Sequence, residues 1–317
     1  MSQQASSVLQ KETAEREGYE TPGGRILFRD EAEFQKKKTV LVSGGPEHVH
    51  FVVDFDRTLT AHKLEDGSVA SSSHGALESP IVFDQDTLVH LKELTEKYYP
   101  IEICHEKTQE EKIPFMLEWW GTAHELMLKA KVKQTAIGDC VRASSMALRK
   151  GARELLLECR NAQIPLLLFS AGLHDVIVEA LKMWGYGEDK NIHVVSNRMI
   201  FNGGEITGFT EPIIHTFCKN EGSARTLLGD EYTQAVDHRE SVILLGDSLG
   251  DVHMIDGASG LTDTRKNVIR IGFLNDKFDD LREKYLNEYD VVLEGDCSMK
   301  FVLDLLRSIE GFGGGTG

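Results

Sequence analysis

Two aspartates stand two residues apart, directly after an apolar run. Residues 50–55 (His-Phe-Val-Val-Asp-Phe) are typical of a buried strand, with Asp54 near its end and Asp56 just beyond it. In an extended chain, side chains two residues apart point to the same side. The two carboxylates would therefore lie close together and repel, so they need a cation or shifted pKa values. This pair predicts a site for metal-assisted or acid–base chemistry.

Polar and small residues also follow two other apolar runs. The segment 170–172 (Ser-Ala-Gly) comes after the run 165–169, and the segment 246–251 (Gly-Asp-Ser-Leu-Gly-Asp) comes after the run 242–245. Backbone amides at the start of a helix bind anions, and carboxylate oxygens bind hard cations such as Mg²⁺. In doubly wound sheets, ligands bind beyond the carboxyl ends of the strands. We therefore expect these three segments to meet in one site.

The combined set suits phosphoryl transfer. Asp54 and Asp247 would hold Mg²⁺, with Asp251 in or behind the first coordination shell. A carboxylate facing phosphorus can act as a nucleophile, and a second one can protonate the leaving oxygen and then deprotonate water. Mg²⁺ and a lysine would neutralise the transferring phosphoryl group. The groups that we expect around the substrate phosphate are Ser170, the amides of Ala171 and Gly172, Lys219 and Ser248.

The elements that must position these residues follow an alternating pattern. Buried apolar strands that alternate with helices indicate an α/β fold with a doubly wound, mainly parallel sheet. Residues 84–151 instead have helical periodicity, with a capping-box pattern at Thr108 and Glu111. We expect an N-terminal arm (1–24), an α/β core (25–60 and 160–310), a helical cap (61–159) and a flexible tail (311–317). The later elements are expected as strands 166–169, 192–195, 198–201, 205–209, 242–245, 268–272 and 289–293, and as helices 174–183, from Gly250 onward, 276–286 and 299–309.

Composition narrows the class of partner. The 317 residues include 51 acidic and 35 basic side chains, a formal net charge of -16. Nucleic acid polymers require a basic surface, so we expect none as a partner, although one small phosphate can still bind. No apolar run approaches the ~18 residues of a membrane span, and the start lacks the apolar region of a signal peptide. The five cysteines are scattered singly, as in reduced proteins. We expect a cytoplasmic protein, monomeric or weakly oligomeric.

Four elements follow one another along the chain: the DxDxT pattern at 54–58, Ser170, Lys219 and the segment 246–251. In this order they resemble the motifs of the haloacid dehalogenase (HAD) superfamily of phosphatases. The resemblance implies that Asp54 is the nucleophile and Asp56 the general acid and base. It also implies a metal site made by the Asp54 side chain, the backbone carbonyl of Asp56 and Asp247. The helical block lies where that superfamily inserts its cap.

Longer stretches are similar to the eukaryotic cytosolic 5'-nucleotidase III family, which covers pyrimidine and 7-methylguanosine-phosphate nucleotidases. The resemblance runs from about residue 25 to 309 and is carried by 96–102, 118–120, 169–172, 194–197 and 244–248. It implies a nucleoside monophosphate substrate, a base contact from Glu102 and an aromatic platform at Trp120. Arg57 stands where an apolar residue is usual, and Trp120 where pyrimidine-preferring relatives often carry Tyr. A Trp face suits a cationic methylated purine, so the base preference stays open.

Three other functions fit parts of the sequence. Residues 246–250 spell GxSxG, the pattern of a serine esterase, but the only later histidine is His253, and the esterase leaves Asp54 and Asp56 without a role. A nucleotide-binding regulator without turnover would need neither a nucleophile nor a second acid. A HAD phosphatase that acts on another small phosphate ester remains an alternative.

Overall fold

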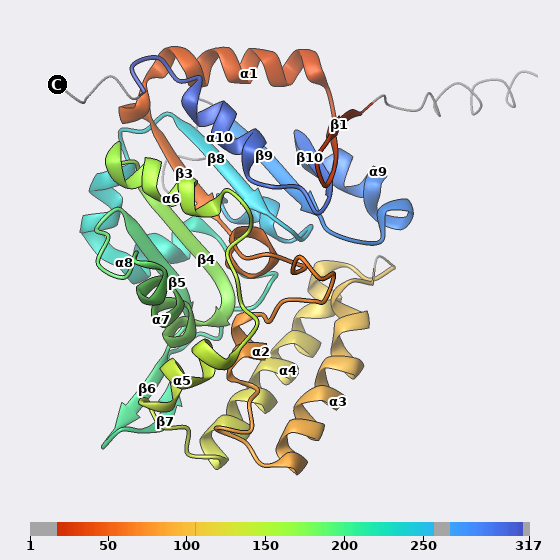
Figure 1. Cartoon of the computed structure of the whole chain (residues 1–317), viewed down its shortest axis with the longest axis vertical. Coiled ribbons are helices and arrows are strands. Elements are labelled where there is room, and N and C mark those ends of the chain that lie inside the picture. The colour runs from red at the N-terminus through yellow and green to blue at the C-terminus, as the bar shows by residue number, and fades with distance from the viewer. Residues whose placement is uncertain (1–17, 105, 257–266, 313–317) are drawn as a thin grey trace, which may run out of the picture.

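The computed structural model describes residues 18–104, 106–256 and 267–312. Its centre is an eight-stranded sheet with the order β1-β2-β10-β9-β8-β3-β4-β5 (Figure 1). The strands from β10 to β5 in this order run parallel, and the β1–β2 hairpin joins β10 antiparallel. The predicted α/β fold with a mainly parallel sheet is confirmed.

The strands and helices of the structure agree with most of the predicted segments. The strands are β1 (Tyr19–Thr21), β2 (Gly24–Phe28), β3 (Val49–Val53), β4 (Leu166–Leu173), β5 (Ile192–Asn197), β6 (Met199–Asn202), β7 (Glu205–Phe209), β8 (Ser241–Gly246), β9 (Asn267–Leu274) and β10 (Val291–Gly295). The helices are α1 (Glu31–Gly44), α2 (Ser73–Leu77), α3 (Gln85–Glu102), α4 (Gln109–Lys129), α5 (Ala136–Ala143), α6 (Ala152–Asn161), α7 (His174–Trp184), α8 (Glu221–Val236), α9 (Phe278–Glu288) and α10 (Lys300–Arg307).

Both faces of the sheet are buried, which explains why its central strands are mostly apolar. Along β3, Phe51 and Val53 pack into one hydrophobic cluster and Val52 packs into the other. Successive side chains of a strand point to opposite faces, so a strand covered on both faces is apolar at most positions; buried His50 is the polar residue of β3. Helices α1, α6, α7 and α10 contribute to the first cluster, and α8 and α9 to the second.

Helices α3 and α4, which we name the cap helices, lie together at one end of the sheet (Figure 1). The predicted capping box starts α4: the Thr108 amide donates to Glu111 Oε2 at 2.7 Å, and the Glu111 amide donates to Thr108 Oγ1 at 3.3 Å. Two later helices of the predicted helical block face core helices instead. Helix α5 packs against α7, and α6 packs against α10.

Two local predictions were wrong. Tyr19–Thr21, which we expected within a loose arm, forms edge strand β1 because its backbone pairs with Gly24–Ile26 of β2. In place of the helix expected from Gly250, the described residues up to Asp256 form one 3₁₀ turn, Asp251–His253. Residues 1–17 of the predicted arm and 313–317 of the predicted tail lie outside the described residues.

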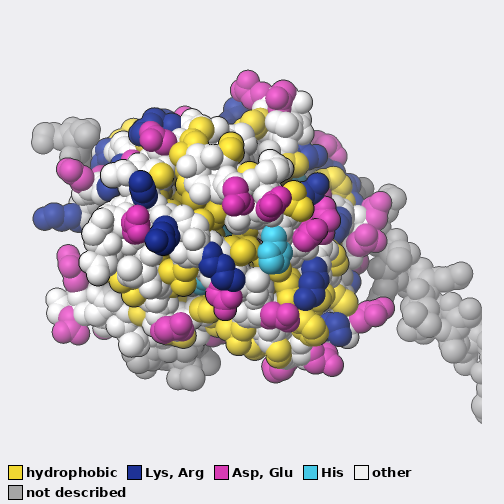
Figure 2. Space-filling model, turned by 90° about the horizontal axis from the view of Figure 1, so that it is seen from below, with side chains coloured by type: hydrophobic (Ala, Val, Ile, Leu, Met, Phe, Trp, Pro, Cys, Tyr) yellow, Lys and Arg dark blue, Asp and Glu magenta, His cyan; other side chains and the backbone are white. Residues whose placement is uncertain are grey.

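The surface carries mixed charge at the end that bears the cap helices. On the face shown in Figure 2, acidic and basic side chains of the described residues are interspersed, and no broad basic area is present. None of the helices in the described ranges is long and apolar enough to cross a membrane.

Candidate active site

The three predicted segments meet because their strands are neighbours. Strand β3 lies between β8 and β4, and all three run parallel, so their carboxyl ends share one edge of the sheet. Asp54 follows β3, Ser170 lies in β4 where its pairing with β5 becomes irregular, and Asp247 follows β8. A cavity of about 380 Å³ opens there, between this edge and the cap helices. Sequence reasoning therefore placed these segments correctly, from strand ends alone.

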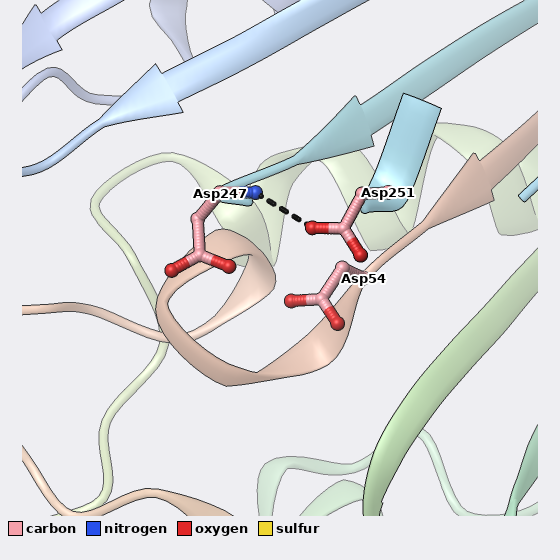
Figure 3. A group of neighbouring side chains, drawn as sticks. All are labelled: Asp54, Asp247 and Asp251. Atoms are coloured by element: carbon pink, nitrogen blue, oxygen red, sulfur yellow. Dashed lines mark hydrogen bonds between the residues drawn. The ribbon is translucent and has the colours of Figure 1, made fainter. Parts of the chain in front are cut away.

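Three carboxylates converge at this edge (Figure 3). Oxygens of Asp54, Asp247 and Asp251 all lie within 4.8 Å of one another. Burial raises the pKa of Asp54 to about 7, although the charge of Lys219 opposes this rise. Burial, and then the charges of Asp54 and Asp251, hold the pKa of Asp247 well above its usual range. Asp54 Oδ2 is buried and has no hydrogen-bond partner among the described residues. An unpaired buried carboxylate oxygen beside two further acids fits a divalent cation, which would supply the missing charge.

Lys219 provides positive charge beside these acids. Its Nζ donates to Asp54 Oδ1 at 2.8 Å and also contacts Asp251 Oδ1. Burial alone would lower the pKa of this lysine, but Asp251 and Asp54 outweigh burial and raise it. Lys219 is therefore a permanent cation, 4% exposed, at the edge of the predicted phosphate site.

Asp56 is not part of the group of three acids and is held by Ser73. The Ser73 amide donates to Asp56 Oδ1 at 2.7 Å, and its hydroxyl donates to Oδ2 at 2.5 Å. Burial raises the pKa of Asp56, and the bonds from Ser73 counteract part of that rise. Sequence reasoning missed Ser73, because it is one of four serines within residues 68–73 and no pattern distinguishes it from the others. In the structure it begins α2.

The segment Ser170–Gly172 is fixed by close packing. Ser170 Oγ accepts a hydrogen bond from the Gly172 amide at 3.0 Å. A Cβ atom at Gly172 would lie 1.9 Å from Ser73 Oγ, so only glycine allows this approach. The carbonyl of Ala171 accepts from Trp120 Nε1 and from Asn197 Nδ2, both at 2.8 Å. A cap helix thus contacts the predicted phosphate-binding segment directly.

Asp251 organises the turn that carries Asp247. Its Oδ2 accepts from the amides of Asp247 and Ser248, at 3.1 and 2.9 Å, and from Ser248 Oγ at 2.9 Å. The hydroxyls of Tyr285 and Tyr289 donate to the carbonyls of Asp247 and Ser248. These two tyrosines carry no sequence signal, since they lie in and just after α9, about 40 residues away. The Ser248 hydroxyl therefore stabilises the turn. His253 contacts Asp256 instead of Ser248, with 2.7 Å between His253 Nδ1 and Asp256 Oδ2. This arrangement does not provide the triad of a serine esterase.

The cap side of the cavity is acidic and aromatic. Glu102 lines it, and Glu102 Oε1 accepts from Thr216 Oγ1 at 2.5 Å. Burial raises the pKa of Glu102, with Thr216 as the largest opposing influence. Trp119 and Trp120 both line the cavity and meet edge to face, with ring centroids 4.5 Å apart. Trp119 also stacks on Tyr98.

Two arginines shape the turn after β3. Arg57, with φ of +62°, lines the cavity, and its guanidinium lies 5.7 Å from the ring centroid of Tyr99 on α3. Arg149 is 2% exposed and donates to the carbonyls of Arg57 and Thr58. Burial lowers the pKa of Arg149 to about 10, so it remains a cation. Arg149 thereby anchors the turn that presents Asp56, a role with no signature in the sequence.

The mostly parallel sheet, with helices packed on both faces, has the fold of HAD-type phosphatases. A HAD family hydrolase from Salmonella enterica shares the fold, with a TM-score of 0.52, 12% identity and coverage of 84% of this chain and 72% of that one. Within this class, residues 57–310 match the family described as pyrimidine 5'-nucleotidase (UMPH-1). The chain belongs to this family, and it is therefore an enzyme of the 5'-nucleotidase class.

Several relatives cover most of the chain. The 7-methylguanosine phosphate-specific 5'-nucleotidase of Gallus gallus is 40% identical over 266 residues, which cover 84% of this chain and 89% of the relative. That of Mus musculus is 36% identical over 285 residues, covering 90% and 92%. The crystal structure of cytosolic 5'-nucleotidase IIIB bound to cytidine superposes with a TM-score of 0.80 at 34% identity, covering 90% of this chain and 93% of that one.

Proposed function

We propose that this enzyme hydrolyses nucleoside 5'-monophosphates to nucleoside and phosphate, with pyrimidine and 7-methylguanosine monophosphates as the favoured substrates. The observation that carries the proposal is the meeting of Asp54, Asp247 and Lys219 at one sheet edge, beneath a cavity walled by Glu102 and Trp120. The names of the relatives and the cytidine complex support a nucleoside ligand. A relative named putative cytosolic 5'-nucleotidase 3, from Caenorhabditis elegans, supports a cytoplasmic site of action.

The chemistry follows from the two carboxylates of the turn after β3. An oxygen of Asp54 attacks phosphorus, the bond from phosphorus to O5' breaks, and Asp56 gives its proton to the departing oxygen. Asp56, now a carboxylate, then takes a proton from a water molecule. That water attacks the aspartyl phosphate, the bond from phosphorus to Asp54 breaks, and inorganic phosphate leaves. The raised pKa of Asp56 favours the protonated form that the first step needs.

The phosphate is held from two sides during these steps. We assign its oxygens to the Ser170 hydroxyl, the amides of Ala171 and Gly172, and the Lys219 ammonium. Gly172 now bonds Ser170, so its amide would exchange that partner for the substrate. Ser248, which we also placed at the substrate, contributes by keeping its turn in shape through Asp251.

A divalent cation, which we propose to be Mg²⁺, completes the site. Asp54, Asp247 and the backbone carbonyl of Asp56 would hold it, with Asp251 behind them because its Oδ2 is already committed to the turn. When bound, the cation neutralises charge on the phosphoryl group. This assignment fits the unpaired Asp54 Oδ2 and the mutual repulsion of the acids.

The proposed division of labour assigns chemistry to a core (25–60 and 160–310) and base selection to a helical cap (61–159). Glu102 offers a carboxylate to donor groups on the base, and Trp120 offers an aromatic surface. Closure over the substrate would exclude water from the aspartyl phosphate. The Trp120 bond to the Ala171 carbonyl ties this surface to the phosphate-binding segment.

A phosphate-release panel tests the proposal. Cytidine, uridine, 7-methylguanosine, adenosine and guanosine monophosphates are compared with ribose 5-phosphate, each with Mg²⁺ and with EDTA. We expect release that depends on Mg²⁺ and is at least tenfold faster for one of the favoured nucleotides than for ribose 5-phosphate. If ribose 5-phosphate is hydrolysed as fast as the nucleotides, the enzyme is instead a HAD phosphatase that acts on another small phosphate ester.

Asp54→Asn separates catalysis from binding. An amide is a poor nucleophile, so we expect phosphate release to fall by at least about 10³-fold, whereas nucleotide still binds in calorimetry. Wild-type chain that binds nucleotide with Mg²⁺ but releases no phosphate would favour the regulator instead. Exposed Asp230 provides the matched control, since Asp230→Asn removes the same charge far from the cavity.

A further inference from the structure

The end of helix α3 touches the turn 215–218 in front of Lys219. Thr216 Oγ1 donates to Glu102 Oε1 at 2.5 Å, and both side chains line the cavity. Thr216 is 9% exposed, so this bond is shielded from bulk water. The second carboxylate oxygen, Glu102 Oε2, makes no hydrogen bond to any other residue within the described part of the chain. One oxygen is thus occupied by the protein, and the other is available to a ligand.

Glu102 needs outside support at this position. It is the last residue of α3, where the helix dipole disfavours a negative charge. Lys112 of α4 compensates, because its Nζ donates to the Glu102 carbonyl at 2.9 Å. The same ammonium lies 5.2 Å from the ring centroid of Phe217. The backbone and the carboxylate of Glu102 are therefore tied, through Lys112 and Thr216, to the same turn.

The turn 215–218 is held by its own hydrogen bonds. The Cys218 amide donates to the His215 carbonyl at 3.1 Å, the Phe217 amide donates to His215 Nδ1 at 3.2 Å, and the His215 amide donates to Cys218 Sγ at 3.1 Å. Lys219 follows immediately and reaches Asp54. This compact turn thus carries Thr216, the partner of Glu102, and Lys219, the proposed catalytic ammonium, follows three residues later.

We propose that Thr216 is a positioning residue for base recognition. Its hydroxyl fixes the Glu102 carboxylate so that Oε2 accepts a hydrogen bond from an N–H or amino group on the edge of the nucleobase. Through the turn 215–218, the same contact couples an occupied base pocket to the placement of Lys219. The inference rests on the proposed nucleotidase function and adds the group that orients its base-recognition carboxylate.

The coupling has a kinetic consequence. Binding energy from a remote part of a substrate raises kcat when it is used to align reacting groups. The base should therefore increase kcat as well as affinity, and Thr216 should be needed for both effects. Ribose 5-phosphate, which lacks a base, should depend on Thr216 much less.

Thr216→Val tests this, because valine keeps the shape and removes the hydroxyl. With cytidine monophosphate we expect kcat/KM to fall about 30-fold, divided between a higher KM and a lower kcat; a hydrogen bond to a charged group has about this weight. With ribose 5-phosphate we expect about a twofold loss. Thr216→Ser retains the hydroxyl and should recover most of the nucleotide activity. Thr122→Val, which removes a cap-helix hydroxyl bonded to the Glu118 carbonyl, is the control for general damage.

The outcomes separate the inference from the function beneath it. Equal losses for both substrates, no loss for the nucleotide, or a lower KM would each overturn the positioning role; a lower KM would mean that the contact holds Glu102 away from the base. Failure of the wild-type enzyme to prefer nucleotides over ribose 5-phosphate would instead defeat the proposed function. The melting temperature of each variant shows whether it is folded, so equal losses in a variant that melts like the wild type count against the positioning role.

Discussion

At the scale of single residues, Ser73 is the most informative addition to the expected site. It donates two hydrogen bonds to Asp56, one from its amide and one from its hydroxyl. We expect Ser73→Ala to lower kcat about tenfold with little change in KM, because Asp56 keeps the amide bond but loses the hydroxyl bond, and a proton donor that is held less firmly transfers its proton less often. Steady-state phosphate release measures this. Ser72→Ala is the matched control, since the Ser72 hydroxyl caps α2 without touching Asp56. A similar loss of kcat in Ser73→Ala and Ser72→Ala would show that Ser73 acts only by stabilising helix α2.

The sequence indicated the acids that meet at the sheet edge better than the residues that hold this edge in place. Asp54 and Asp247 can be recognised in the sequence because each lies just after an apolar strand. The two residues lie close together because these strands, β3 and β8, are neighbours in the sheet. Ser73 and Arg149 act through single long-range contacts, and a serine or an arginine makes such contacts from many kinds of segment. Their roles depend on the tertiary packing of segments far apart in sequence, and no local pattern encodes it.

At the scale of elements, His124 joins helix α4 to strand β7. Its ring stacks on Phe209 with centroids 3.7 Å apart, and its Nε2 is buried with no hydrogen-bond partner in the described residues. Burial, and then the neighbouring His74, lower the pKa of His124 to about 3. In the unfolded chain this pKa is about 6.5. The histidine is therefore neutral in the folded protein at every pH above about 3.

This difference predicts an acid-sensitive contact between α4 and β7. Above pH of about 6.5 neither state binds the proton; between about 6.5 and 3 the unfolded state binds it preferentially, so stability falls as the pH falls. We expect His124→Phe, which preserves an aromatic stack, to reduce the loss of unfolding free energy between pH 7 and pH 5 by about 2 kcal/mol. Urea unfolding at the two pH values measures it. The same substitution at exposed His90 should leave the pH dependence as it is in the wild type. An unchanged pH dependence in His124→Phe would mean that His124 is protonated in the folded state.

The sequence predicted helices and strands well where the buried apolar residues recur in a clear pattern. Apart from His50 in β3 and Ser241 in β8, these two central strands consist of apolar residues and glycine because both faces of the sheet are covered, which made them easy to predict. Strand β1 was missed because its three residues are half-buried or exposed and gain their structure from backbone pairing with β2. The 3₁₀ turn at Asp251–His253 was taken for the start of a helix, because the side chain of Asp251 bonds the amides that precede it.

At the scale of the whole molecule, the active site is a source of instability until it is filled. Three acids lie at one sheet edge, inside a protein whose formal net charge is already -16. Lys219 neutralises part of this charge, yet burial and mutual repulsion still raise the pKa values of Asp54 and Asp247. Folding must therefore overcome the mutual repulsion of these acids. A cation that binds only the folded chain would recover that free energy.

This reasoning predicts opposite effects of one substitution with and without metal. With Mg²⁺ at about 100 times its Kd, the wild-type melting temperature should rise by about 4 °C over the value in EDTA. Asp247→Asn removes one of the repelling charges and one ligand. We therefore expect it to melt higher than the wild type in EDTA and to gain less than about 1 °C from Mg²⁺. Asp230→Asn, which removes an exposed charge of α8, should respond to Mg²⁺ as the wild type does. If Asp247→Asn melts lower in EDTA, or keeps the full response to Mg²⁺, the three acids do not form one cation site.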